Sequence, residues 1–261
     1  MNMNKFVFNS KMSIIQKITL AGLFIALTTI LQKVVAINYL PILPFVRISF
    51  GGTALIIYSS IVLGPFWGLL VGASSDLLGY LIFDPKTMGF FPQITAIYAV
   101  LGFVSYFVYK LIKTIKNEKV LLIVEYSFFA AMFVFLTVFI SCSSSLTLYG
   151  TTYQLEVWQK ITIPLVLAAL SVCLFVCNFF ISKYFKKKSV QNVNVHTISF
   201  SCLIIEIGVM MAFGTLMKGW AFGFSTYPVI LISQIIVGFV NIPLNTFLIS
   251  YIMLFTRKYI E

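Results

Sequence analysis

The chain has 261 residues, of which 60% are hydrophobic and only 10% are charged. A soluble domain carries about 25% charged residues, so this composition excludes an ordinary water-soluble globule and predicts an integral membrane protein. The net charge is +11, from 18 Lys and Arg against 7 Asp and Glu. In a soluble protein that excess would suggest a nucleic-acid partner, but its distribution along the chain gives it another meaning here.

Apolar runs of roughly 20 residues, the length that crosses a bilayer, recur through the whole chain. They predict an all-α fold, a polytopic transmembrane helical bundle of about eight spans, in a single membrane domain (residues 1–261). The basic N-terminal segment precedes a run too long for a signal peptide, so we interpret that run as the first span. The predicted spans are residues 16–36, 48–63, 65–83, 91–110, 120–140, 159–182, 198–218 and 229–255.

The basic residues predict the orientation of this bundle. Eight spans place 13 of the 18 basic residues on one side of the membrane. The positive-inside rule makes that side cytoplasmic, together with both termini. The positive charge is therefore explained by topology, and we expect no nucleic-acid partner. The residues are Lys5, Lys11, Lys17, Lys110, Lys113, Lys116, Lys119, Lys183, Lys186, Lys187, Lys188, Arg257 and Lys258.

Small residues spaced four apart occur in two predicted helices. Gly22 and Ala26 form such a pair in the first span, and Gly64, Gly68 and Gly72 repeat the spacing around the start of the third. This spacing lets another helix approach closely in lipid. We therefore expect close helix packing at both places.

Two opposite charges flank the second and third spans. Arg47 stands at the outer end of the second span, and Asp76 lies in the third. Asp76 is about 18 Å along a helix from Gly64, at 1.5 Å per residue, which places it in the outer half of the membrane. Ionisable residues at that depth face a partner or a cavity. Two interpretations stay open: a structural contact of Asp76 with Arg47 or with a Ser or Tyr, and an outward-facing polar pocket.

The predicted outer loops and helix ends add cations, amides and aromatic rings. Such a set suits a planar, anionic organic solute better than an inorganic ion. The proposed substrate-binding residues are Arg47, Asp76, Lys86, Phe91, Gln93, Lys218, Trp220 and Gln234.

The sequence carries no pattern typical of an enzyme or a primary pump. HExxH and the phosphate-binding GxxxxGK[ST] are both missing. The four cysteines form no CxxC, and the chain has one histidine. We therefore expect no catalytic residues, no metal site and no cofactor. What remains is a membrane binding or permease subunit that takes its energy from another protein.

Residues 14–115 resemble the substrate-binding S component of energy-coupling factor (ECF) vitamin transporters, and they are most similar to the folate-type branch. Span eight, with its mid-helix proline, is similar to the last helix of that family. The motifs that carry the resemblance are Arg47-Ile48-Ser49-Phe50, Leu63-Gly64-Pro65-Phe66-Trp67-Gly68, Asp76-Leu77-Leu78-Gly79 and Phe90-Phe91-Pro92.

The resemblance implies a subunit of the bacterial plasma membrane that binds a vitamin outside the cell. It implies as partners a transmembrane coupling subunit and two cytosolic ATPases, whose ATP hydrolysis topples the S component and releases the vitamin inside. Gly22 and Ala26 match the small residues that face the coupling subunit in that family. Since the family has six helices, residues 119–182 are interpreted as an inserted hairpin and residues 14–115 and 198–258 as the six-helix core.

Folate is the leading substrate in this interpretation. Its flat pterin suits aromatic stacking, and its glutamyl carboxylates suit Arg47, Lys86 or Lys218. Two alternatives remain: an S component for another water-soluble vitamin or precursor, and a ligand-free membrane scaffold or assembly protein in which Arg47 and Asp76 form a structural pair.

Overall fold

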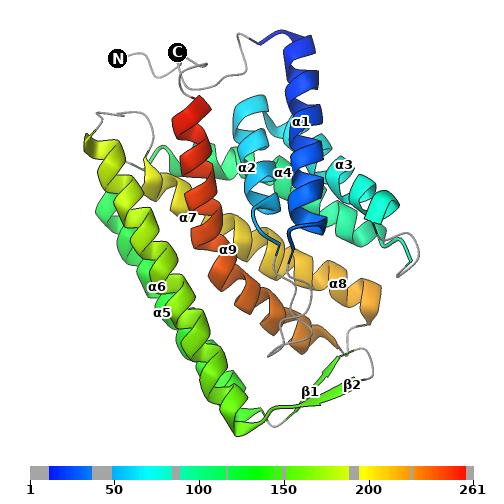
Figure 1. Cartoon of the computed structure of the whole chain (residues 1–261), viewed down its shortest axis with the longest axis vertical. Helices are drawn as coiled ribbons and strands as arrows, with labels where there is room; N and C mark the ends of the chain where they lie inside the picture. The colour runs from blue at the N-terminus through cyan, green and yellow to red at the C-terminus, as the bar shows by residue number, and fades with distance from the viewer. Residues whose placement is uncertain are drawn as a thin grey trace.

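The computed structural model is a helical bundle with one small two-stranded sheet (Figure 1). It describes residues 12–36, 49–83, 89–115, 117–143, 145–148, 151–187, 194–223 and 226–256. The elements, in chain order, are α1 (Ile14–Lys33), α2 (Gly52–Leu63), α3 (Pro65–Phe83), α4 (Pro92–Ile112), α5 (Glu118–Cys142), β1 (Ser145–Leu148), β2 (Thr151–Gln154), α6 (Val157–Lys187), α7 (Val195–Ile205), the π-helical segment η3 (Glu206–Phe213), α8 (Gly214–Phe222) and α9 (Tyr227–Thr256).

Every predicted span corresponds to a helical stretch, which confirms the all-α membrane fold. Within the described chain, six stretches are long and apolar enough to cross a membrane, fewer than the eight predicted. The two predicted spans outside this set are α2 and α6. At 12 residues, α2 is about 18 Å long, too short to cross a hydrocarbon core about 30 Å thick. The six candidate spans are Ile14–Lys33, Pro65–Phe83, Pro92–Ile112, Glu118–Cys142, Val195–Phe222 and Tyr227–Met253.

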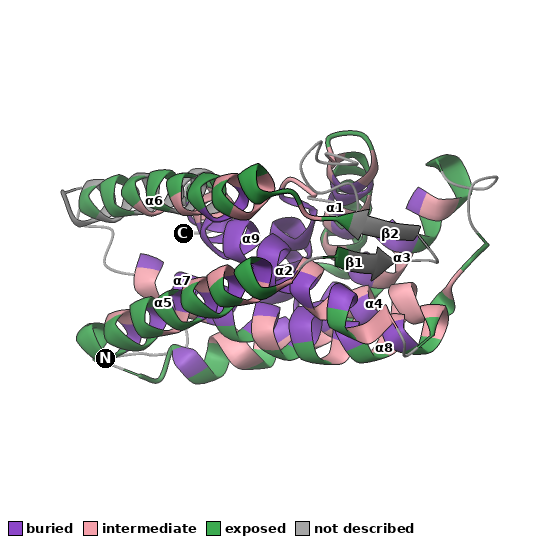
Figure 2. Ribbon diagram, turned by 90° about the horizontal axis from the view of Figure 1, so that it is seen from below, coloured by how far each residue is buried: buried purple, intermediate pink, exposed green. Residues whose placement is uncertain are grey.

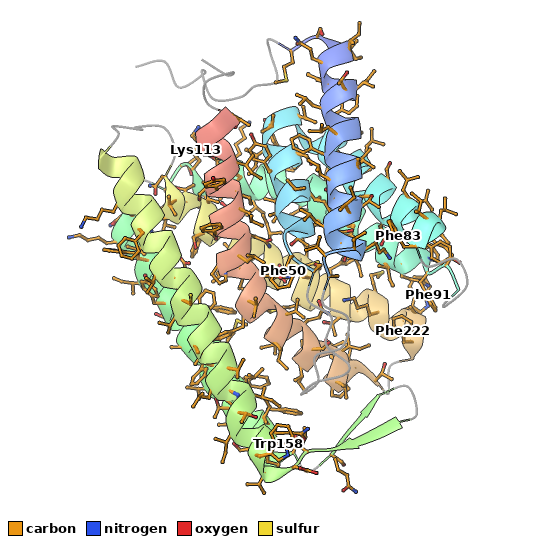
Figure 3. All side chains as sticks on the ribbon, in the orientation of Figure 1. Phe50, Phe83, Phe91, Lys113, Trp158 and Phe222 are labelled. Carbon is orange, nitrogen blue, oxygen red and sulfur yellow. The ribbon has the colours of Figure 1, made fainter. Side chains whose placement is uncertain are left out.

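The start of α1 and the end of α9 lie at the same end of the molecule, as an even number of crossings requires (Figure 1). Lys113, which follows α4, lies toward this end as well (Figure 3). The cytoplasmic assignment of this end stays a prediction.

The short helix α2 forms the centre of the bundle. All of its residues are buried, and Figure 2 shows the buried colour gathered on α2 and α9. Two buried polar contacts join these helices: Thr53 Oγ1 donates to Asn245 Oδ1 at 3.0 Å, and the Tyr58 hydroxyl pairs with Thr256 Oγ1 at 2.7 Å. Since α2 has no lipid-facing side, its short length is compensated by its neighbours.

The helices α3 and α4 touch at their backbones, as the glycine spacing predicts for α3. A Cβ placed on Gly68 would lie 2.6 Å from the carbonyl oxygen of Gly102, and one placed on Gly72 would overlap the carbonyl of Tyr98. The turn before α3 is tight, because Gly64 takes a φ of 104° and Pro65 opens α3 without a polar loop. The close partner of these glycines is thus the next helix in the chain.

The hairpin made by α5 and α6 extends along one edge of the molecule (Figure 1), with α9 between its two arms in Figure 2. Three aromatic rings join the three helices: Phe129 of α5 lies 4.7 Å from Phe175 of α6 and 5.4 Å from Phe239 of α9, between ring centroids. At the base of the hairpin, Asn194 donates a 2.8 Å hydrogen bond to Glu118. The chain therefore leaves the bundle and returns to it at nearly the same place.

The antiparallel strands β1 and β2 close the far end of this hairpin, with Ser145 opposite Gln154 and Leu148 opposite Thr151. No strand was predicted here, because a four-residue strand between two long apolar runs is too short to show an alternating pattern. β-branched threonines in both strands favour this pairing.

Candidate ligand-binding site

Two aromatic residues meet where α4 begins and α8 ends, the end predicted to face the outside. Phe91 is the N-cap of α4, and its ring centroid lies 4.8 Å from that of Phe222, in the last turn of α8, at an interplanar angle of 59°. Figure 3 shows both rings together at one edge of the molecule. The sequence predicted Phe91 as a site residue, and its partner Phe222 was missed.

Below these rings lie the predicted Gln93 and Lys218. Lys218 precedes Phe222 by four positions, so the two side chains share one face of α8, and Lys218 is half-buried. The Gln93 Oε1 atom is buried and has no hydrogen-bond partner among the described residues. An unpaired buried carbonyl costs about 1–3 kcal/mol, so a donor from a ligand would stabilise it.

Gln234 is buried in α9, which packs against α8 and η3. It lies four positions before Gly238, where α9 touches η3 through Met211 and Glu206. The predicted residues Gln93, Lys218 and Gln234 thus lie on α4, α8 and α9, and α8 packs against both of the other helices. We call Phe91, Gln93, Lys218, Phe222 and Gln234 the outer cluster.

Among the described residues, the predicted Trp220 does not join the outer cluster. Trp220 is 64% exposed on the outside of α8. Arg47 and Lys86 lie outside the described residues.

Asp76 makes a helix–helix contact instead. Its Oδ2 accepts a 2.7 Å hydrogen bond from Thr95 Oγ1 of α4. The aliphatic stem of Lys33 lies against Gly79, one turn further along α3. The described surroundings of Asp76 favour the structural interpretation of this carboxylate.

Two buried carboxyl groups inside the bundle were missed by the site prediction. Glu206 opens η3 and Glu125 lies on α5, and their exposures are 1% and 2%. Glu125 accepts a hydrogen bond from Ser199 of α7, and Glu206 hydrogen-bonds with Asn241 of α9. A lone acidic residue within an apolar span is itself a signal of function, and both could have been singled out on that ground.

The described residues contain no group of three or more His, Cys, Asp and Glu side chains placed to hold a metal ion. The free thiol of Cys202 is fully buried, near Glu206 and Thr246. The buried polar residues described in the structure can therefore bind a ligand through hydrogen bonds and single charged groups.

The pair Gly22 and Ala26 lies on an exposed face of α1. No atom outside the local helix lies within 4 Å of a Cβ placed on Gly22. Large exposed side chains flank the pair, including Ile18 at 56% and Ile30 at 47%. The close packing expected at this position is therefore not made within the described part of this chain.

The sequence profile of the family "ECF transporter, substrate-specific component" matches residues 16–180, which is more than half of the chain. The chain belongs to this family. It is a substrate-binding S component, a transport subunit and not an enzyme, and it is a multi-pass protein of the cell membrane. S components associate with an energizing module of T and A subunits and bind a substrate. No curated protein and no solved structure matches the chain.

Proposed function

We propose that this S component captures folate from outside the cell at the outer cluster. The observation that carries the proposal is the buried, unpartnered Oε1 atom of Gln93, two residues after Phe91, whose ring lies against Phe222. Lys218 lies one helical turn before Phe222. Rings, an amide and a cation match three kinds of group in folate: its aromatic rings, its amide and amino groups, and its carboxylates.

Lys86 and Arg47 are proposed to meet the glutamyl carboxylates of folate from the loops that follow α3 and precede α2. Both residues lie outside the described part of the chain, so their support is the sequence pattern alone. A second candidate substrate is another water-soluble vitamin or precursor with a flat ring and an anionic group.

Transport is proposed to follow from docking of α1 on the transmembrane coupling subunit. The exposed face at Gly22 and Ala26 supports this assignment, because small residues let a second helix approach closely in lipid. Two cytosolic ATPases then drive toppling of the S component and release of the vitamin inside.

Binding can be measured by isothermal titration calorimetry of the purified protein in lipid nanodiscs. The titrants are folate and a panel of riboflavin, thiamine, pantothenate, biotin and pyridoxine. Saturable binding of folate, weakened at least tenfold in Lys218→Gln, is the expected result. Lys160→Gln is the matched control, because it removes a cation at the start of α6, away from the outer cluster.

If another vitamin binds in place of folate, that vitamin is the substrate and the proposed transport role is unchanged. If folded protein binds no vitamin of the panel, the scaffold interpretation gains, and Asp76 is then purely structural.

A further inference from the structure

Two interacting side chains in the interior of the bundle each have an acceptor atom without a donor among the described residues. Glu206 of η3 and Asn241 of α9 are both 1% exposed and hydrogen-bond with each other. That bond leaves Glu206 Oε1 and Asn241 Oδ1 without a partner among the described residues. Both remaining atoms are oxygens on adjacent side chains.

Such a pair is costly unless something pairs with it. A buried acceptor without a donor costs about 1–3 kcal/mol, and more when it carries charge, and a carboxylate at membrane depth is rare outside functional sites. The two oxygens match a chemical group that presents two N–H donors along one edge. Amidines, amino-substituted ring lactams and guanidine-like groups have this pattern.

The backbone opposite Glu206 carries no side chain at Gly238, and the Met211 side chain fills the space there. A Cβ placed on Gly238 would lie 3.7 Å from Glu206 Oε1 and would overlap the terminal methyl of Met211. The glycine therefore keeps the carboxylate side of α9 free of a side chain. Met211 covers the position with the most adaptable of the apolar side chains, which can move aside for a ligand.

The π-helical segment directs this carboxylate toward the outer cluster. Glu206 and Lys218 interact electrostatically although they lie about three turns apart. In a regular α-helix, positions 206 and 218 would point about 120° apart, at about 100° per residue. The wider turns of η3 rotate the chain less per residue, which brings the two side chains toward a common side. π-helical segments are often found at functional sites.

We propose that Glu206 and Asn241 form the deep end of the ligand site and accept two N–H donors from one edge of the transported molecule. The inference rests on the proposed function and deepens it. Folate carries such an edge, made by the 2-amino group and the neighbouring ring N–H of its pterin. In this arrangement the pterin edge meets Glu206 and Asn241, and the rest of the molecule extends past Lys218 to the Phe91–Phe222 pair.

A double-variant experiment tests the pairing of donor and acceptor. Folate and 2-desamino-folate are titrated into wild-type protein and Glu206→Gln in nanodiscs. We expect folate affinity to fall at least 30-fold in Glu206→Gln, and 2-desamino-folate to bind both proteins with similarly low affinity, because the lost acceptor and the lost donor belong to one interaction. Glu125→Gln is the matched control, since it makes the same change at the other buried carboxyl, and it should leave both affinities unchanged.

Each other outcome is decisive. Folate binding that is equal in wild type and Glu206→Gln overturns the inference and leaves the proposed function standing. An equal loss in Glu125→Gln also overturns it, because the effect is then general to buried carboxyls. If only a vitamin without two adjacent donors binds, such as pantothenate, the inference fails while the transport role stands. If folded protein binds none, both fail.

Discussion

The Thr95 hydroxyl of α4 donates a 2.7 Å hydrogen bond to the Asp76 carboxylate of α3. Asp76 is buried, and the bond lies on the same helix pair that the glycine contacts hold at backbone distance. The sequence left open whether Asp76 binds a ligand or contacts a neighbouring helix, and in the structure its carboxylate accepts a hydrogen bond from α4.

Thr95→Val should destabilise the protein by about 1 kcal/mol, the order found for hydrogen bonds between membrane helices. The loss comes from a buried carboxylate deprived of one donor. The loss of stability is measured by heating the protein in detergent and quantifying the fraction that remains folded by size-exclusion chromatography. Thr19→Val is the control, because Thr19 is exposed and donates only to its own helix at Ile15; an equal shift in both variants would deny the α3–α4 bond a special role.

Gly68→Ala should destabilise the protein by about 1–3 kcal/mol, the usual cost of overpacking a tight interface. The added methyl group would meet the carbonyl oxygen of Gly102 at 2.6 Å, and backbone cannot move as freely as a side chain. Gly22→Ala, with open space around the new methyl, should be neutral or slightly stabilising, since alanine favours the helix. The same unfolding assay compares the two, and similar stabilities would contradict the backbone contact.

Gly22→Leu combined with Ala26→Leu should abolish assembly with the T and A subunits and leave vitamin binding intact. Two leucines would cover the exposed face of α1 without touching the interior. Co-purification with the energizing module and calorimetry of the isolated subunit measure the two properties. Ala130→Leu, at an exposed position of α5, is the control. A double variant that still assembles would move the docking face elsewhere.

Deletion of residues 118–193, with a short Gly-Ser linker in their place, should leave a folded and ligand-binding core. We interpret α5 and α6 as an insertion because Glu118 and Asn194 are hydrogen-bonded at the base of the hairpin. Monodisperse elution and retained vitamin binding are the measurements. An unfolded or aggregated product would instead make the hairpin part of the family core, in line with the family match that extends to residue 180.

Much of this architecture could be predicted from the sequence because its signals are strong and local. The length of the apolar runs predicts the helices, and the dipeptide Gly64-Pro65 is typical of the tight turn found before α3. The spacing of the glycines predicts the close contact that α3 makes with α4. The sequence does not show which side of each helix faces lipid, because lipid and protein interior are equally apolar. For that reason the sequence does not show that Gly22, which has the same spacing as Gly68, lies on the surface while Gly68 is packed against α4.

The site was harder to predict than the fold. Residues with suitable chemistry were chosen from the expected loops and helix ends. Phe91 lies against Phe222 and Trp220 faces outward, while a joint site of Phe91, Gln93, Lys218 and Gln234 stays a prediction. The π-helical geometry of η3 has no signature in residue type, so the side chains that it turns inward could not be derived from helical periodicity. Glu206 was visible as a single acid in an apolar run, but its neighbour Asn241 is adjacent only in space.

The short central helix has a consequence for how the protein is made. Because α2 is too short to be held by the bilayer alone, it must enter the membrane together with α3 across the Gly64-Pro65 turn. The hydroxyl groups of Thr53 and Tyr58 meet Asn245 and Thr256 only after α9 has been synthesised, 192 and 198 residues further along the chain. A nascent chain that stops before α9 therefore lacks the hydrogen-bond partners of these two hydroxyl groups at its centre.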